Sequence, residues 1–254
     1  KNKIKKQKKL ILIFTIIFNL SFLLVLKYNN IFILMFNNLF KTNFSFFNFF
    51  IPLALSYYTL EAISYIADVY NEKYEAETNF LKIMLYMSFF PLMVEGPITR
   101  YNQIQDHIYK GNDFNYQRIC NSLLRITWGF IKKLVIADRV AVFVNAIYGS
   151  NYVGLSIILA MLLYVLQIYA EFSGCMDIVI GIGGLFGINL PENFNTPLLS
   201  KNINEFWRRW HITLGTWLKD YIFYPISLSK LNLKINILTH KWKNKHLADS
   251  ISIL

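Results

Sequence analysis

The sequence predicts an all-α integral membrane protein, a multi-span helical bundle with re-entrant and interfacial helices. Of its 254 residues, 55% are hydrophobic and 17% aromatic, whereas only 16% are charged. The apolar residues form long blocks instead of alternating with polar ones, which is typical of membrane-spanning segments. Lysine clusters flank some of these blocks, as expected at the cytoplasmic face of a membrane.

The formal net charge of +11 does not indicate nucleic-acid binding. Much of it comes from lysines in Lys1–Lys9 and Lys230–Lys245, which flank apolar segments. Such residues are held on the cytoplasmic side during membrane insertion. We therefore expect a multi-pass protein of the cell membrane, with the lipid bilayer and no nucleic acid as partner.

The N-terminal part predicts two long apolar elements. Leu10–Leu26 follows a lysine cluster without a cleavage pattern, so we expect a retained first span with its N-terminal side in the cytoplasm. Tyr28–Asn43 leaves two alternatives open, a short half-span and an interfacial segment. Phe44–Ala67 is a long apolar stretch in which Glu61 is expected to face the bundle and to hydrogen-bond a tyrosine.

The middle of the chain predicts one span and one surface helix. Phe80–Val94 is apolar and ends at the helix-breaking pair Gly96 and Pro97. Ile119–Asp138 is amphipathic, so we expect an interfacial helix whose basic residues face lipid phosphates. These basic residues are Arg118, Arg125, Lys132, Lys133 and Arg139.

Tyr152–Phe172 is the clearest predicted span. The glycine-rich stretch that follows, Gly174–Leu190, resembles a dinucleotide fingerprint only weakly, and close helix packing is the preferred interpretation. A re-entrant course remains open for it. Asp177 is expected to cap a helix or face the bundle. Cys120 and Cys175 are expected to be core residues, without a disulfide or a metal.

A dense charged and aromatic segment, Asn202–Pro225, follows the predicted spans. Charges at membrane depth are costly and usually mark function. On a continuous helix, spacings of three and four residues would place one set of side chains on a common face. This set is Trp207, Trp210, His211, Leu214 and Leu218.

Four segments resemble consecutive motifs of the membrane-bound O-acyltransferases, and most closely those of the alginate O-acetyltransferase branch. They are Ser88–Ile98, Gln167–Asp177, Pro191–Ser200 and Phe206–Tyr221. The resemblance implies helices around a tunnel in a bacterial cytoplasmic membrane. It also implies acyl transfer from a cytoplasmic thioester, acetyl-CoA or an acyl carrier, to a hydroxyl of an exported polysaccharide or envelope glycan. No permanently bound cofactor is implied, and an extracytoplasmic acyltransferase partner is possible.

The resemblance also assigns roles to residues. His211 matches the first of two polar residues that meet in the family's tunnel, as base or orienting group. The second, a histidine in a Trp-His pair on a later apolar helix, has no match, because His240 and His246 lie in a lysine-rich loop. We therefore expect residues 1–254 to be a single partial membrane domain, a fragment lacking C-terminal helices.

The remaining predicted site residues are substrate-binding. They are Arg208, Arg209, Trp207, Trp210 and Asp220. Arginine binds phosphate through a planar fork of donors, although anchoring at the headgroup layer explains the two arginines equally well. Alternative functions are D-alanyl transfer to teichoic acid, a non-catalytic remnant and, with less support, a transporter.

Overall fold

The computed structural model describes residues 2–47, 49–93, 95–150 and 152–229. Every regular element among these residues is a helix, which confirms the predicted all-α class. The chain divides into two compact units, Lys1–Asn195 and a second that begins at Thr196. Each is described separately below. The single partial domain expected from the sequence stays a prediction.

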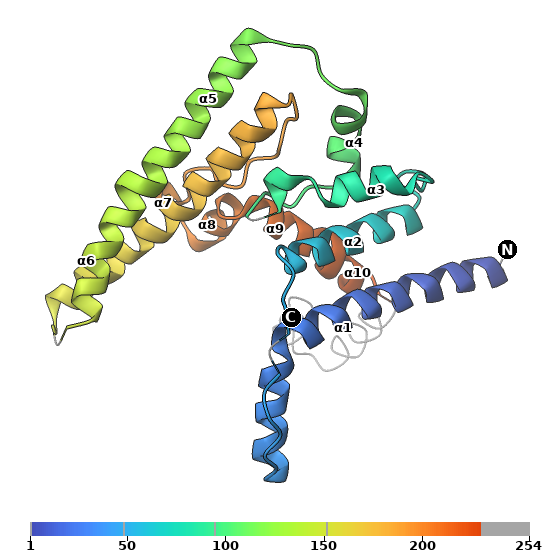
Figure 1. Ribbon diagram of the computed structural model, residues 1–254, viewed down its shortest axis with the longest axis horizontal. Helices are drawn as coiled ribbons and strands as arrows, with labels where there is room; N and C mark the ends of the chain where they lie inside the picture. Colours follow the sequence, from blue (N-terminus) through green and yellow to red (C-terminus); the bar gives the residue numbers. More distant parts are fainter. Residues whose placement is uncertain (1, 48, 94, 151, 230–254) are drawn as a thin grey trace, which may run out of the picture. The chain divides into compact units, whose positions relative to one another are not determined.

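The first helix, α1 (Asn2–Phe40), is longer than predicted. Its 39 residues extend about 58 Å, roughly twice the ~30 Å hydrocarbon core of a bilayer. The helix does not end at Leu26 but continues through the segment for which a half-span or an interfacial course was open. Its first half and its lighter blue second half run in different directions (Figure 1).

The apolar stretch Phe44–Ala67 is not helical throughout, because the described residues of its first part have no regular secondary structure. Asparagine side chains of α1 hydrogen-bond the backbone of this part, which offers it an alternative to helix. Asn29 Nδ2 donates to the Phe47 carbonyl at 3.0 Å, and Asn37 Nδ2 donates to the Phe44 carbonyl at 2.9 Å. Helix α2 (Leu55–Tyr70) starts only after this segment.

The predicted span at Phe80–Val94 is also wrong. Helix α3 (Phe80–Met87) has eight residues, or about 12 Å, and cannot cross a bilayer. It ends at Ser88, and a 3-10 turn containing Pro91 follows at Phe90–Leu92. Helix α4 (Tyr101–Lys110) lies after the Gly-Pro break.

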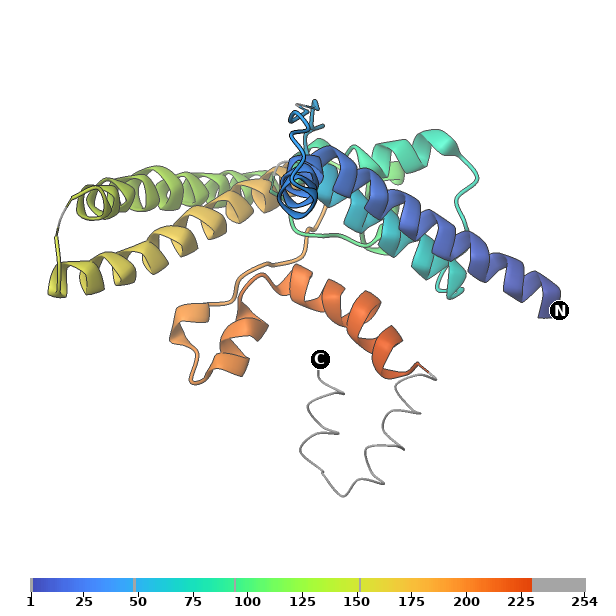
Figure 2. The same cartoon turned by 90° about the horizontal axis from the view of Figure 1, so that it is seen from below.

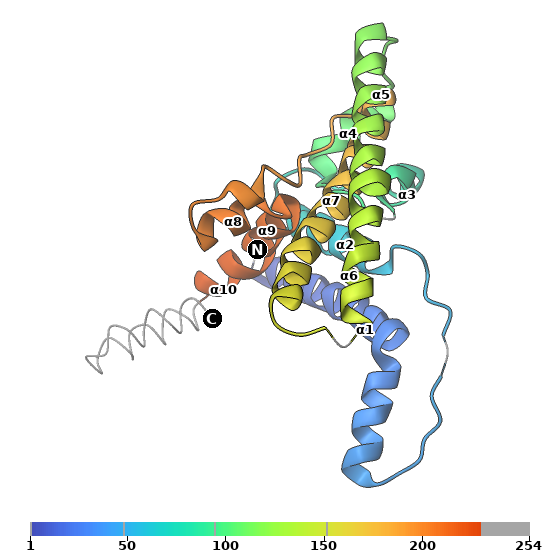
Figure 3. The same ribbon diagram turned by 90° about the vertical axis from the view of Figure 1, so that its left-hand side faces the viewer.

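One long antiparallel pair dominates the first unit. Helix α5 (Tyr116–Phe130), a π-helical stretch at Ile131–Ala137 and α6 (Asp138–Tyr148) form a continuous run. This run packs along α7 (Leu155–Leu185), as Figures 1, 2 and 3 show. Helix α7 is unbroken. Up to Leu185, the glycine-rich stretch is therefore part of a continuous helix and does not fold back as a re-entrant segment.

Two glycines set the closest approach of this pair. A Cβ on Gly129 would lie 2.6 Å from the Gly174 carbonyl oxygen, and a Cβ on Gly174 would lie 2.8 Å from the Gly129 carbonyl oxygen. The preferred interpretation of the glycine-rich stretch, close helix packing, is therefore confirmed.

Two helices among the described residues are long and apolar enough to cross a membrane. They are the α1 segment Lys3–Phe40 and α7. In the second unit, a 3-10 turn at Pro197–Leu199 precedes four further short pieces, coloured orange to red in Figure 2. These are α8 (Ile203–Arg209), α9 (Ile212–Leu218), a π-helical turn at Lys219–Phe223 and α10 (Tyr224–Ser227).

The glycine contact predicts a stability effect. Gly129→Ala should lower the free energy of unfolding by about 1–3 kcal/mol, because the added methyl meets backbone that must move apart. Thermal unfolding of the purified chain in detergent, followed by circular dichroism, measures the change.

Gly215→Ala is the matched control. Beyond its own helix, no atom of the described residues lies within 4 Å of its added Cβ, and the residue lies inside α9, so the melting temperature should hold or rise slightly. Equal melting temperatures for Gly129→Ala and the unaltered chain would contradict the account.

Candidate functional site

The predicted catalytic residue, His211, lies where two helices break. Trp210 is extended (φ −101°, ψ 127°), and His211 is left-handed (φ 46°, ψ 54°). The expected continuous helix and its shared aromatic face are therefore wrong. The left-handed region costs a residue other than glycine about 1–3 kcal/mol, although histidine adopts it more readily than most.

The break is held by backbone and aromatic contacts. The His211 carbonyl accepts a hydrogen bond from Gly215 N at 3.1 Å, which starts α9. The Trp210 ring stacks on Phe206, with centroids 5.5 Å apart and planes 19° apart. His211 is half-buried, and this burial lowers the pKa of its imidazole below the ordinary 6.5. The ring is therefore neutral at pH 7 and able to accept a proton.

The predicted substrate-binding residues have different surroundings. Arg209 pairs with Glu205 at 2.6 Å and also donates to Thr196 Oγ1 at 3.2 Å. Glu205 and Arg209 thus form an ion pair one helical turn apart on α8. Arg208 is exposed, as is Trp207 with an exposed fraction of 61%.

The last of these residues, Asp220, is exposed in the π-helical turn after α9. The structure therefore places Trp210 and His211 at the break itself and leaves Arg208, Trp207 and Asp220 accessible. His240 and His246, to which no role was assigned, lie outside the described residues.

A second polar centre lies between α5 and α7. Of its residues, the sequence predicted an inward position only for Asp177. The carboxylate of Asp177 accepts hydrogen bonds from Arg125 Nε at 3.1 Å and from Lys132 Nζ at 2.6 Å. Arg125 also binds Glu192 through both terminal nitrogens, at 2.7 and 2.6 Å. The predicted bundle-facing position of Asp177 is confirmed.

The predicted lipid-facing position is wrong for three basic residues, Arg125 of α5 and Lys132 and Lys133 of the π-helical stretch that follows it. Arg125, Lys132 and Lys133 were expected to face lipid phosphates, but they face carboxylates, and Lys133 Nζ lies 2.5 Å from Glu171 Oε1. The available signal was the six-residue spacing of Glu171 and Asp177, which places two acids on the same helix.

Glu61 belongs to a buried contact between α2 and the Gly-Pro break. Its side chain is buried, with 1% exposed. Thr99 Oγ1 donates to Glu61 Oε1 at 3.4 Å, and the Tyr57 hydroxyl contacts both Glu61 and the Pro97 carbonyl. The predicted bundle-facing carboxylate beside a tyrosine is confirmed.

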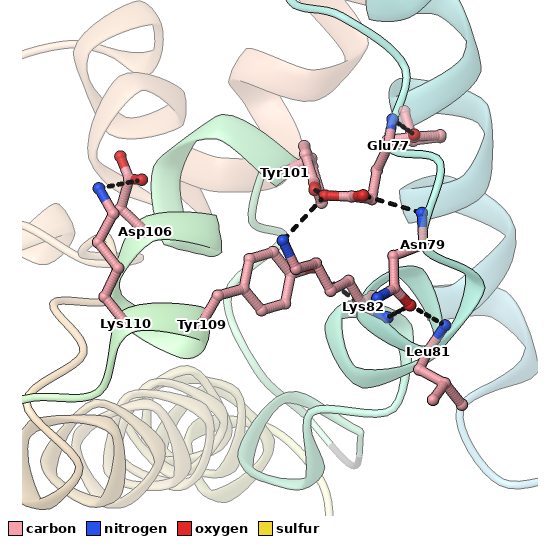
Figure 4. A network of polar contacts seen from close by, with 9 residues as sticks. Glu77, Asn79, Leu81, Lys82, Tyr101, Asp106, Tyr109 and Lys110 are labelled. Carbon is pink, nitrogen blue, oxygen red and sulfur yellow. Dashed lines mark hydrogen bonds and ion pairs between the residues drawn. The ribbon is translucent and has the colours of Figure 1, made fainter.

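A further polar network joins α3 to α4 (Figure 4). Tyr101 Oη donates to Glu77 Oε2 at 3.2 Å, and Tyr109 Oη donates to the Lys82 carbonyl at 2.7 Å. Asn79 caps α3 by accepting from the backbone of its first turn. These bonds orient the segment that leads to the Gly-Pro break and have no feature of a catalytic centre.

The described residues contain no group of three or more histidine, cysteine, aspartate or glutamate side chains placed to hold a metal ion. Cys120 and Cys175 are both free thiols. At the His211 break, the neutral imidazole can take up a proton, and the exposed side chains of Arg208 and Trp207 lie nearby in the sequence.

Comparison with known proteins follows from these features. The family model of MBOAT, the membrane-bound O-acyltransferase family, matches residues 76–239, which include the His211 break and the α5–α7 pair. A peptidoglycan O-acetyltransferase of Helicobacter pylori is 36% identical over 249 residues, covering 87% of this chain and 47% of the relative.

Two further relatives extend the comparison. A probable alginate O-acetylase of Pseudomonas aeruginosa is 36% identical over 178 residues, which cover 70% of this chain and 34% of the relative. A teichoic acid D-alanyltransferase of Bacillus subtilis is 29% identical over 182 residues, 67% of this chain and 44% of the relative. The chain thus spans about half or less of the length of these curated relatives.

The ion-pair centre predicts a stability effect. Asp177 is largely shielded, with 13% of its side chain exposed, so Asp177→Asn takes the carboxylate from Lys132 and leaves Arg125 with Glu192 alone. We expect a loss of about 2 kcal/mol in the free energy of unfolding, less than the ~3–5 kcal/mol of a fully buried pair. Chemical denaturation in detergent measures it.

Asp106→Asn is the matched control, because Asp106 pairs with Lys110 at 2.9 Å on the exposed face of α4. No measurable change is expected for such a surface pair. Equal losses in the two variants would refute a structural role for the α5–α7 ion pairs.

Proposed function

The chain belongs to the membrane-bound O-acyltransferase family, and from this premise we propose that it transfers an acyl group, in the first instance acetyl, to a hydroxyl of an exported polysaccharide or cell-envelope glycan. The donor is a thioester, acetyl-CoA or an acylated carrier, on the cytoplasmic side. The names of the relatives support this class, because two of them acetylate or are assigned to acetylate such polymers.

One observation carries the proposal to a residue. His211 combines a strained left-handed backbone, partial burial and a lowered pKa within the segment that matches the family. Strained residues with tuned proton affinity cluster at functional sites. We assign His211 as the general base or the group that orients the acceptor.

The proposed step transfers the acyl group from the thioester to the acceptor hydroxyl, with His211 as the base. The imidazole takes the proton of the acceptor hydroxyl. At the same time, the hydroxyl oxygen attacks the carbonyl carbon of the thioester. The carbon–sulfur bond then breaks, and the imidazolium returns its proton to the leaving thiolate, which restores the neutral imidazole. A positioned base of this kind contributes roughly a hundred- to ten-thousand-fold to rate.

The neighbouring residues are assigned to binding. Arg208 is exposed and suits a phosphate of the donor, whereas Arg209 is engaged by Glu205 and has less to offer. Trp207 and Trp210 offer aromatic surface to a sugar or a pantetheine arm. Asp220 is accessible on the helical turn after α9 and suits a hydroxyl-bearing substrate.

The wider setting is also part of the proposal. We place the protein in the bacterial cytoplasmic membrane as a multi-pass chain, with helices around a tunnel and with an extracytoplasmic acyltransferase as a partner. Helices α1 and α7 support a membrane location by their length and composition.

The test replaces His211 in the chromosomal gene, so that the cell's own product is altered. His211→Asn should lower the initial rate at which acetate is esterified to the envelope polymer by at least about a hundredfold. Asparagine tolerates the left-handed backbone but cannot act as the base. Alkaline release and mass spectrometry of the esters measure the product.

Lys41→Asn is the backbone control. Lys41 also has a positive φ, 53°, and is exposed on the first unit, so its replacement should leave ester content unchanged. Wild-type ester content in His211→Asn would remove His211 from the mechanism. Loss of D-alanyl esters in place of acetyl esters would favour the teichoic acid relative's chemistry.

The lowered pKa predicts a pH dependence. Burial disfavours the charged imidazolium, so His211 stays neutral to lower pH than a free histidine. The acidic limb of kcat/KM should therefore have its midpoint below 6.5. A midpoint above this value, measured in membrane vesicles with acetyl-CoA, would argue against His211 as the titrating base.

A further inference from the structure

Two adjoining cavities lie at the C-terminal end of α7, within the first unit. One has a volume of about 520 Å³ and a mostly polar lining that includes Gln117, Asn121 and Arg125. The other, of about 470 Å³, has a largely apolar lining. Arg118 and Ile188 line both cavities, so the guanidinium of Arg118 lies at their common boundary.

Arg118 is the unsatisfied cation at this junction. Its Nη2 donates to the Asp113 carbonyl at 2.6 Å, while its buried Nε has no acceptor within the described part of the chain. Its guanidinium lies against Gly187, where an added Cβ would be 3.0 Å from the guanidinium carbon. An arginine with an unused buried donor favours an oxyanion ligand.

The other charges of the polar cavity are already compensated. Arg125 is bound by both Asp177 and Glu192, and Glu192 directs both of its oxygens at Arg125. Neither carboxylate forms an ion pair with Arg118 among the described residues. An entering anion therefore meets one free positive charge.

The apolar cavity offers exposed aromatic surface. Phe114 is 80% exposed, and Phe186 is 51% exposed with its ring 5.8 Å from that of Phe90. Leu85, Phe89 and Ile108 complete the lining. Large exposed apolar side chains beside a cationic group match an amphiphile with an anionic head.

The depth of the cavities fits a lipid headgroup. Helix α7 has 31 residues, or about 46 Å, of which roughly twenty are enough to cross the ~30 Å hydrocarbon core. With its first twenty residues in that core, the cavity residues Gly181 and Gly184 would lie at the level of the headgroups. Basic residues gather at this end, whereas residues 149–154 at the other end carry no charge, which favours the cytoplasmic leaflet.

We propose that these paired cavities form a binding site for an anionic phospholipid, with the headgroup phosphate on Arg118 and an acyl chain along Phe114 and Phe186. The inference is independent of acyl transfer. It differs from the proposed donor site in lying wholly within the unit Lys1–Asn195.

The test measures binding of phosphatidylglycerol, fluorescently labelled on its acyl chain, to the detergent-purified chain. Arg118→Gln should weaken binding about tenfold, the loss of one charge-assisted contact. Phe114→Ser should weaken it about fivefold and keep the preference for phosphatidylglycerol over phosphatidylcholine. Phe114 is so exposed that its replacement leaves folding intact, and circular dichroism checks both variants.

Arg139→Gln is the matched control, because it removes one exposed positive charge from the same helical run outside both cavities, and binding should be unchanged. Equal affinity in Arg118→Gln and the unaltered chain overturns the proposal. Equal competition by phosphatidylcholine does so too. Displacement of the lipid by equimolar coenzyme A or inorganic phosphate would assign the cavity to a soluble phosphate compound instead.

Discussion

The first unit depends on the contact between Gly129 and Gly174. Because neither residue has a side chain, α5 and α7 approach until backbone meets backbone, and a Cβ on either would collide with a carbonyl oxygen. This closeness brings Arg125 and Lys132 within hydrogen-bonding distance of Asp177. Charges that would be costly on a lipid-facing helix are thereby neutralised inside the pair.

The same contact has consequences at the end of α7. With Arg125 held by two acids, Arg118, about two turns earlier on α5, keeps a buried Nε donor without an acceptor among the described residues. In the second unit, the left-handed backbone of His211 separates α8 from α9. The polar side chains of the first unit are thus held by ion pairs. In the second unit, His211 is held in a strained backbone conformation.

The sequence predicted the first part of α7, the close packing of its glycines and the inward position of Asp177, because hydropathy and small residues report directly on helix packing, but it did not predict that the helix continues from Phe172 to Leu185. It failed at Phe44 and Phe80, where hydropathy is high but asparagine hydrogen bonds and Pro91 stop the helix. It also missed the break at His211, since no glycine or proline marks that position. A left-handed histidine is fixed by surrounding contacts that residue spacing does not reveal.

The central claim is that this chain moves an acyl group from a thioester to an envelope polymer. The most direct test follows radiolabelled acetyl-CoA in membrane vesicles from cells that contain or lack the gene, with polymer present. The account predicts that label reaches the polymer as an alkali-labile ester only where the chain is present. Equal labelling in vesicles without it would contradict the claim.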